Sequence, residues 1–496
     1  MANYTVTGEG TAKTLNDNDV LTVTVTGVIN TPGSAVLMQD YLGSVLNAGT
    51  LACSYGGAIE ARAGYQRIVN SGTIGGATGI ELSPFSVQPG GNSIVNTGSI
   101  TGTTSRGIII GSGGNTISNS GTISSQLSEA IVIGSGFSDE GYYLDNLIVN
   151  SGLITANFSF FVSAAIKTYA NADTVLNSGT IRGGLDLGNG TNTANNTGWI
   201  VGNVVTGTGS DTVVNHGTLD GNITLGDGAD RFDGRDGDLN GHVAGGLGDD
   251  VYVIDDATTI ILEDYLDVPN ADRVESSVSF TLLSNIEELT LTGTAHLRGI
   301  GNDGRNVLTS NSGNSTLQGR GGDDLILGGL GDERLDGGFG NDVIYAAEGD
   351  DTANGGAGND LLTGFLGDDF LRGGAGNDTL HGEQDNDTLL GGDGADSMTG
   401  GAGLDVFLFV RPSEATSAAQ DRITDFTRGE DLIDLSTLDG TLAYRGTGAY
   451  VAGGAQMRIV VGGNTQLLID LNGDNTTDMK IILTGNINLQ AADFIL

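Results

Sequence analysis

The sequence contains almost no cysteine, proline or tryptophan. Its 496 residues include one cysteine, Cys53, five prolines and one tryptophan. A single cysteine excludes an internal disulfide, and we expect Cys53 to pack as a small apolar residue. Long hydrophobic runs are also missing, since the longest apolar stretch, around 158–166, is far shorter than the roughly 20 residues that a membrane-spanning helix needs. We therefore expect no membrane-spanning segment.

Positive charge is scarce as well. The chain has 20 basic and 61 acidic side chains, a net charge of −41. Residues 1–185 hold only 11 acidic and 6 basic side chains, so nearly all of this charge lies further along the chain. A polyanion repels nucleic acid and anionic lipid, which argues against nucleic acid as a partner. A cation is the natural partner of such a chain.

The first residues, MANYTVTGEG, have neither a basic region nor an apolar region of the kind found in secretory signals. We therefore expect no cleaved N-terminal export signal. If the protein is exported, the signal lies elsewhere in the chain.

Glycine, by contrast, is abundant, with 85 residues and no three-residue period, which excludes collagen. A short phrase recurs at variable spacing, as LNAGTL at 46–51, VNSGTI at 69–74, VNTGSI at 95–100, SNSGTI at 118–123, VNSGLI at 149–154, LNSGTI at 176–181, NNTGWI at 195–200 and VNHGTL at 214–219. Each repeat reads as two short strands separated by turns and is too short to bury its own core. Stacked repeats would bury a shared one, which predicts a parallel β-helix. The asparagines from Asn47 to Asn215 are expected to form a hydrogen-bonded ladder at one corner.

The repeat becomes regular and acidic between positions 186 and 250. Its phrases are GNGTN at 188–192, GTGSD at 207–211, GDGAD at 226–230 and GLGDD at 246–250. We take Asp230 and Asp250 from these phrases as candidate metal ligands.

A second repeat, nine residues long, begins at 301 and stays in register from 319 to 408. It follows the pattern G-G-x-G-x-D-x-U-x through ten consecutive units, from GRGGDDLIL to GGAGLDVFL. We expect the first six positions to form a loop and the last three a strand. Glycine permits positive φ, so that carbonyl oxygens can converge, and the sixth position supplies a carboxylate. Such oxygen ligands suit Ca²⁺ better than Mg²⁺. The position-six candidates are Asp324, Glu333, Asp342, Asp351, Asp360, Asp369, Asp378, Asp387, Asp396 and Asp405.

Energetics also indicate that several calcium ions are needed. One unit buries roughly one apolar side chain, about 1.5–3 kcal/mol, whereas ordering nine residues costs on the order of 10 kcal/mol. Residues 319–408 hold 19 acidic and 3 basic side chains, so their mutual repulsion weakens folding further. The array is therefore expected to fold only when a cation binds. Some units depart from the pattern: Glu333 replaces Asp, Ala346 and Ala347 replace glycines, and Asp385 replaces the fourth glycine.

These units resemble the RTX repeats of proteins that Gram-negative bacteria export by type I secretion. The tail resembles the serralysin C-terminal region, in VFLFVRPSEA at 406–415, DRITDFTRGEDLIDLS at 421–436 and the segment 467–496. The resemblance implies a right-handed β-roll with two units per turn and Ca²⁺ between loops two units apart. Carried over, one ion would lie between Gly338, Gly340 and Asp342 on one side and Gly355, Ala357 and Asp360 on the other. It also implies an uncleaved C-terminal export signal ending in Asp493-Phe494-Ile495-Leu496, read by the type I secretion machinery.

Motifs for catalysis are missing. The four histidines do not form HExxH, and no GxSxG occurs, which argues against a zinc protease or a serine hydrolase. A polysaccharide lyase or epimerase is the alternative enzyme class, since some β-helices with RTX modules act on uronic-acid polymers. It would draw on the scattered cations Arg62, Arg67, Arg106, Lys167 and Arg182 and on Tyr55, Tyr65, Tyr142 and Tyr143, but the Asp-Pro-His-Glu motif of the mannuronan epimerases is absent. A further acidic segment at 470–478 resembles part of an EF-hand loop, but Asn475 stands where the glycine is required, which favours a polar turn.

The sequence thus predicts an all-β protein, a right-handed parallel β-helix continuing into a calcium-binding β-roll with a C-terminal β cap. The expected divisions are an N-terminal strand or cap region at 1–40, the β-helix at 41–244, a connector at 245–300, the calcium-binding roll at 301–408 and the cap with its export signal at 409–496. The expected function is that of an extracellular structural or adhesive surface protein, in a surface layer or biofilm matrix, that binds itself or a cell-surface glycan. A glycan-binding adhesin is the nearest alternative.

Overall fold

The computed structural model describes residues 2–40, 42–62, 64–82, 91–134, 144–157, 164–264, 271–416, 418–438, 442–451 and 453–496. The chain divides into two compact units, Met1–Asn270 and Ala271–Leu496, called unit 1 and unit 2 below. Both are built from stacked β-strands that mostly pair in parallel, so the predicted all-β solenoid fold is confirmed. Tyr142 and Tyr143 lie outside the described residues.

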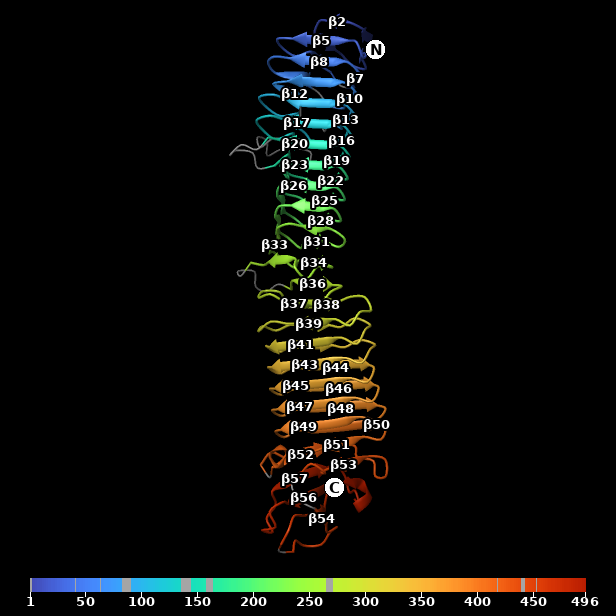
Figure 1. Cartoon of the computed structure of the whole chain (residues 1–496), viewed down its shortest axis with the longest axis vertical. Helices are drawn as coiled ribbons and strands as arrows, with labels where there is room; N and C mark the ends of the chain where they lie inside the picture. Colours follow the sequence, from blue (N-terminus) through green and yellow to red (C-terminus); the bar gives the residue numbers. More distant parts are fainter. Residues whose placement is uncertain are drawn as a thin grey trace. The chain divides into compact units, whose positions relative to one another are not determined.

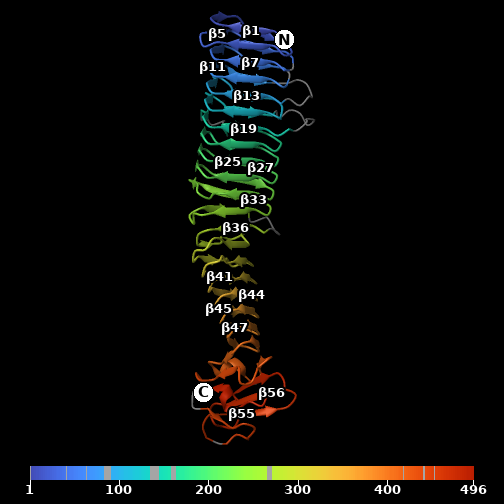
Figure 2. The ribbon, with the colours of Figure 1, turned by 90° about the vertical axis from the view of Figure 1, so that its right-hand side faces the viewer.

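Unit 1 is a stack of coils with three parallel sheets (Figure 1, Figure 2). A coil in its first half contains three short strands, here β10 (Arg67–Asn70), β11 (Thr73–Gly76) and β12 (Thr78–Leu82). Each strand pairs in register with its counterpart one coil later, so that like residues stack on like. Ile68, Ile74 and Ile80 all point inward and are fully buried. Such columns of β-branched side chains form the core of the unit.

The sequence predicted two strands per repeat, and the structure has three. The phrase VNSGTI itself holds the end of one strand and the start of the next, because the chain turns a corner at its Asn-Ser-Gly. At Gly72 an added Cβ would overlap the carbonyl oxygen of Gly49 in the coil before, so only glycine allows coils to stack this closely here.

The predicted asparagine ladder is confirmed at this corner. The Nδ2 group of Asn70 donates to Oδ1 of Asn96 at 2.7 Å, and the same bond joins each successive pair at 2.7–2.8 Å from Asn47 to Asn215. Each described asparagine of the ladder is buried. Buried amides bonded in this way lose no hydrogen bond to water, and they fix the register of the stack.

The later coils of unit 1 keep the same plan with shorter turns. The strands that flank the acidic phrases are β24 (Leu185–Asp186), β25 (Thr193–Asn196), β27 (Val204–Thr208), β28 (Thr212–Asn215), β30 (Ile223–Asp227), β31 (Arg231–Asp233), β33 (His242–Leu247) and β34 (Val251–Ile254). Each acidic phrase is therefore the turn between a strand of one sheet and a strand of the next.

Unit 2 contains the nonapeptide array, which winds into two parallel sheets with two nonapeptides in each turn. One sheet includes β42 (Leu325–Leu327), β44 (Val343–Glu348), β46 (Leu361–Leu366), β48 (Thr379–Gln384) and β50 (Ser397–Ala402). The facing sheet includes β41 (Thr316–Gly321), β43 (Arg334–Phe339), β45 (Thr352–Ala357), β47 (Phe370–Ala375), β49 (Thr388–Asp393) and β51 (Val406–Leu408). One apolar side chain per nonapeptide is buried between the sheets, as with Leu335, Ile344, Leu362, Leu371 and Leu380. The array is broad in Figure 1 and thin in Figure 2, as expected for two sheets that face each other directly.

The expected division of each nonapeptide into a six-residue loop and a three-residue strand was wrong. Most strands are six residues long and continue through the first three positions of the next unit, as in Val343–Glu348. Only the fourth to sixth positions form the turn. The strand pairing skips the first position of each unit: Tyr345 pairs with Thr363 and Ala347 with Phe365, and Ala346 between them is not paired. That gap in the pairing is where the carboxylates lie.

The array ends on a small cap within unit 2. Strands β55 (Gln456–Val461), β56 (Thr465–Asp470) and β57 (Met479–Leu483) form an antiparallel meander, and β57 pairs in parallel with β52 (Asp421–Ile423). The final strand, β58 (Phe494–Ile495), pairs with β53 (Leu432–Asp434). Within the described part of the chain, no helix is long and apolar enough to cross a bilayer.

Candidate metal centre

The turns of the array share one backbone conformation. In the unit 337–345, Gly338 and Gly340 have φ of +108° and +127°, values that glycine adopts readily. The N–H of Gly340 donates to the carbonyl of Ala357, one turn later, at 2.9 Å. The turns are therefore stacked directly above one another.

The position-six carboxylates form two columns, because successive units alternate between the two edges of the roll. The backbone N–H of Asp342 donates to Oδ1 of Asp360, one turn later, at 2.8 Å. The same bond links Asp324 to Asp342 and Asp360 to Asp378 in this column, and Asp351 to Asp369 in the other, at 2.8–2.9 Å. Each aspartate thus has one oxygen fixed by the backbone of the turn before it, whereas Oε2 of Glu333 accepts the N–H of Gly329 in its own turn.

The second oxygen of each carboxylate is buried without a partner. Among the described residues, no group donates a hydrogen bond to Oδ2 of Asp324, Asp342, Asp351, Asp360, Asp369, Asp378, Asp387, Asp396 or Asp405, or to Oε1 of Glu333. These side chains are at most 3% exposed. A buried carboxylate oxygen without a donor is costly, and a long row of them implies a bound cation or bound protons.

Burial raises the pKa of these carboxyl groups. The pKa of Asp360 rises from 3.8 to about 7, and those of Asp351 and Asp387 rise to about 8, in each case chiefly through loss of solvation. The neighbouring carboxylates of Asp378 and Asp342 in the same column add to the rise in the pKa of Asp360. At neutral pH the columns therefore favour any ligand that neutralises them.

The space beside Oδ2 of Asp342 fits an oxygen-liganded ion. A Cβ added to Gly337 would overlap Oδ2 of Asp342 and lie 2.6 Å from the carbonyl oxygen of Gly355. The carboxylate and a carbonyl of the next turn therefore converge on one point. Hard oxygen ligands in flexible loops are the set that Ca²⁺ prefers. The residues present fit calcium, and they would hold it between successive turns.

The structure brings together the residues that the RTX resemblance assigned to one ion. Gly338, Gly340 and Asp342 lie on the turn directly before Gly355, Ala357 and Asp360. The carbonyl of Gly355 converges with the carboxylate of Asp342, while the carbonyl of Ala357 accepts the N–H of Gly340. Asp230 and Asp250 lie in unit 1, where the N–H of Asp230 donates to Oδ1 of Asp250 at 2.8 Å. Their role as ligands stays a prediction.

The two columns are unequal, which the linear sequence did not reveal. Units that depart from the glycine pattern fall mainly on the edge that carries Asp351, Asp369 and Asp387. Ala347, Phe365, Glu383 and Asp385 all stand there at positions that require positive φ, between +72° and +91°. The loops keep their conformation despite these residues, so the turns are strained rather than rearranged.

Sequence reasoning missed the ends of both columns. The N–H of Asp396 donates to Oδ1 of Asp421 at 3.0 Å, and that of Asp405 donates to Asp431 at 3.3 Å. Oδ2 of Asp421 is buried and finds no donor in the described residues, and burial raises its pKa to about 9. Neither spacing fits the nine-residue frame, so only the acidic phrases DRITDF and GEDLIDL marked these positions.

The acidic segment at 470–478 behaves differently, as the sequence indicated. Both oxygens of Asp470 accept backbone N–H groups, from Gly473 at 2.7 Å and from Asn475 at 2.9 Å, and Asp478 accepts the N–H of Leu471 at 2.8 Å. Satisfied carboxylates of this kind make a polar turn between β56 and β57.

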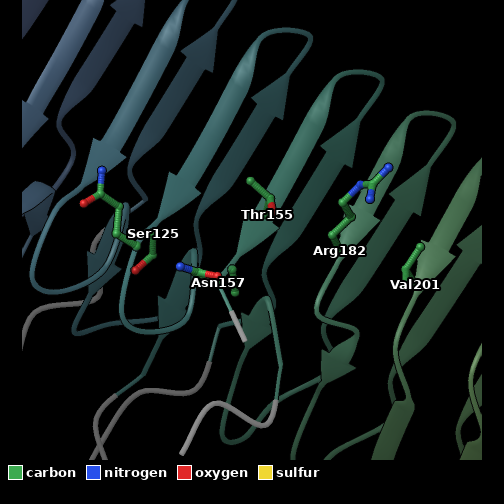
Figure 3. A pocket seen from close by; sticks show the side chains of 7 residues that line it. Ser125, Thr155, Asn157, Arg182 and Val201 are labelled. Carbon is green, nitrogen blue, oxygen red and sulfur yellow. The ribbon is translucent and has the colours of Figure 1, made fainter. Parts of the chain in front are cut away.

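Unit 1 also carries a shallow pocket of about 330 Å³ (Figure 3). Its lining includes Ser125, Asn157 and Arg182, and Figure 3 shows Thr155, Arg182 and Val201 on successive parallel strands. Beside it, the guanidinium of Arg182 stacks on the ring of Trp199, 5.0 Å from the centroid. Of the other scattered cations considered above, Arg106 pairs with Glu129 and Lys167 with Asp186. These pairs do not form a catalytic constellation.

Comparison with protein families agrees with this geometry. The family model described as peptidase M10 serralysin C terminal matches residues 166–496. A solved structure of the AlgE6R3 subunit from the Azotobacter vinelandii mannuronan C5-epimerase is 25% identical over 35% of this chain and 77% of its own, with a TM-score of 0.20. No curated protein matches the chain. The chain therefore belongs to the serralysin C-terminal family, whose repeats are of the RTX type.

Proposed function

We propose that this chain is a secreted calcium-binding structural or adhesive protein, whose nonapeptide array folds around Ca²⁺ after export. The observation that supports this most directly is the double column of buried carboxylates, each with one oxygen that lacks a donor among the described residues. Inside a cell, where free calcium is scarce, such an array would stay unfolded. Outside, extracellular-type sites bind at roughly 0.1–1 mM, within reach of calcium there.

Calcium titration of the full chain tests this proposal. Calcium-free protein at neutral pH should gain β-structure cooperatively on addition of Ca²⁺, measured by circular dichroism, with Mg²⁺ at the same concentration much less effective. A chain that has full β-structure without any divalent ion would contradict the proposal.

Family membership supports export by the type I secretion machinery, with the signal near the C-terminus. Removing about the last sixty residues should leave the protein in the producing cells, because these residues contain the family's export region. The measurement is the fraction of protein in the culture medium, compared with the intact chain. Normal export of the shortened chain would contradict this route.

The extracellular role is structural assembly or adhesion. A glycan-binding adhesin is the second candidate, and the pocket lined by Thr155, Asn157 and Arg182 beside the exposed ring of Trp199 favours it. Electron microscopy with Ca²⁺ separates the two roles: sheets or filaments support assembly, and separate rods support an adhesin. Assays on alginate, pectin and casein should detect no turnover, and clear depolymerisation, epimerisation or cleavage would favour the enzyme alternative instead.

A further inference from the structure

The same turn occurs in unit 1, outside the nonapeptide array. Gly207 and Gly209 have φ of +98° and +125°, close to the values in the array, and the N–H of Gly209 donates to the carbonyl of Asp227 one coil later at 2.7 Å. Each coil in this part of unit 1 carries the acidic turn once, whereas each turn of the array carries it twice.

A single column of side chains follows this corner of unit 1. The N–H of Asn192 donates to Oδ1 of Asp211 at 2.6 Å, and the N–H of Asp211 donates to Oδ1 of Asp230 at 2.6 Å. Further back, the N–H of Asp173 donates in the same way to Asn192 at 3.0 Å. The column therefore has a carboxylate at Asp173, whose Oδ2 also has no donor among the described residues, then an amide at Asn192, and carboxylates from Asp211 to Asp250.

The amide of Asn192 shows what surrounds this position. Its Nδ2 group donates to three carbonyl oxygens, those of Gly188 at 3.2 Å, Gly190 at 3.1 Å and Thr206 at 2.9 Å. Two carbonyls come from its own turn and one from the next coil. The two hydrogens of this amide are shared among the three carbonyls, so this corner needs no ion.

At the next coil the side chain at the centre of this arrangement is the carboxylate of Asp211, which can only accept hydrogen bonds. By the repeat, the carbonyls of Gly207, Gly209 and Leu225 take the corresponding places around Asp211. Within the described residues, Oδ2 of Asp211 has no hydrogen-bond donor, and the side chain is 1% exposed. The neighbouring hydroxyl of Thr206 donates instead to the carbonyl of Leu225 at 2.7 Å. Oδ2 of Asp211 thus lies among carbonyl oxygens without a hydrogen-bond donor of its own in the described residues.

Asp230 repeats the arrangement one coil later. It is 2% exposed, its Oδ2 finds no donor in the described part of the chain, and the carbonyls of Gly226, Gly228 and Gly245 correspond to those above. Oxygen atoms brought together without donors repel one another, and a divalent cation removes that repulsion.

We propose that Asp211 and Asp230 each hold one Ca²⁺ between successive coils of unit 1, and that the side-chain amide of Asn192 replaces the ion at the coil before. Three carbonyls, a carboxylate and water supply the oxygen ligands that Ca²⁺ needs. Coils whose corner is closed by an asparagine amide, such as that of Asn192, then need no calcium, whereas the coils of Asp211 and Asp230 depend on it. This site does not rest on calcium binding by the nonapeptide array.

Calcium counting on the full chain tests the proposal. The variants are Asp211→Asn, Asp230→Asn and the reverse change Asn192→Asp. The control, Asp227→Asn, removes the same charge from an exposed position of the same turn as Asp230. Bound calcium per chain is measured by equilibrium dialysis at a calcium concentration of about 1 mM, where sites of this type fill.

Asp211→Asn and Asp230→Asn should each bind about one calcium ion fewer than the intact chain, because an amide replaces the carboxylate ligand. Asn192→Asp should bind about one more, because a carboxylate ligand replaces the amide. Asp227→Asn should match the intact chain. The asparagine variants should also keep unit 1 folded, because the new amide can bond the same carbonyls. Hydrogen exchange of unit 1 peptides measures this.

Equal calcium counts in Asp211→Asn, Asp230→Asn and the control would overturn the inference while leaving the array proposal intact. Unfolding of unit 1 in either asparagine variant at saturating Ca²⁺ would also overturn it. An intact chain that binds no calcium at all would contradict both proposals.

Discussion

In the absence of calcium, low pH should stabilise the folded nonapeptide array, because protons can neutralise the same buried carboxylates. The pKa of Asp360 in the fold rises from 3.8 to about 7. One pKa unit corresponds to about 1.4 kcal/mol, so holding this one group ionised in the cation-free fold costs roughly 4 kcal/mol above pH 7. The pKa values of Asp324, Asp369 and Asp378 rise similarly, to about 7. Two or three such groups match the whole stability of an ordinary domain, about 5–15 kcal/mol.

The sign of the pH dependence follows from proton binding. Because the folded pKa lies above the unfolded one, the folded array binds more protons between about pH 4 and pH 8. Without calcium its stability is therefore greatest at about pH 4 and falls as the pH rises to about 8. Calcium neutralises the same oxygens, so it should remove most of this dependence.

Hydrogen exchange with mass spectrometry on the full, calcium-free chain measures the effect by region. Peptides from 316–408 should exchange as unfolded chain at pH 8, gain protection at pH 5, and be protected at pH 8 once Ca²⁺ is added. Peptides from 93–125 in unit 1 provide the control, because their buried corners are asparagine amides, which do not titrate. Strong protection of the array at pH 8 without any cation, or no gain at pH 5, would refute the reasoning.

Three further predictions follow from particular residues. Gly355→Ala should destabilise the array by about 1–3 kcal/mol in thermal unfolding with Ca²⁺, because the new methyl group would overlap Oδ2 of Asp360. The control Gly463→Ala, where a Cβ meets nothing within 4 Å, should have little effect. Equal effects of the two substitutions would contradict the close approach of the carboxylate to Gly355. Asp360→Ala should raise the calcium midpoint of folding several-fold and more than Asp387→Ala, since the edge with Asp387 is already strained; equal shifts would contradict a ranking of sites by motif integrity. Asn119→Ala should lower the stability of unit 1 by about 1–3 kcal/mol, because Nδ2 of the preceding asparagine and Oδ1 of the next would lose their partner, and an unchanged melting temperature would show that the ladder is dispensable.

The sequence by itself determined the class of fold and the chemistry of the main site. Repeats too short to bury a core can only stack, so the phrase at VNSGTI and the nonapeptide each implied a solenoid. The buried asparagine ladder followed from one residue recurring at one corner. The position-six aspartates followed from a pattern that combines glycine turns with a carboxylate.

Tertiary structure decided what depends on stacking. The corner within the phrase VNSGTI forms because neighbouring coils approach closely there, which the linear sequence does not show. The sequence therefore predicted two strands per coil where the structure has three. The nonapeptide strands extend into the glycines because the neighbouring turn supplies hydrogen-bond partners for them. The inequality of the two edges, the continuation of the columns to Asp421 and Asp431, and the exchange of Asn192 for Asp211 all concern residues that meet only one turn apart. A linear pattern fixes which residue is present, and the stack fixes which oxygens are left without a donor.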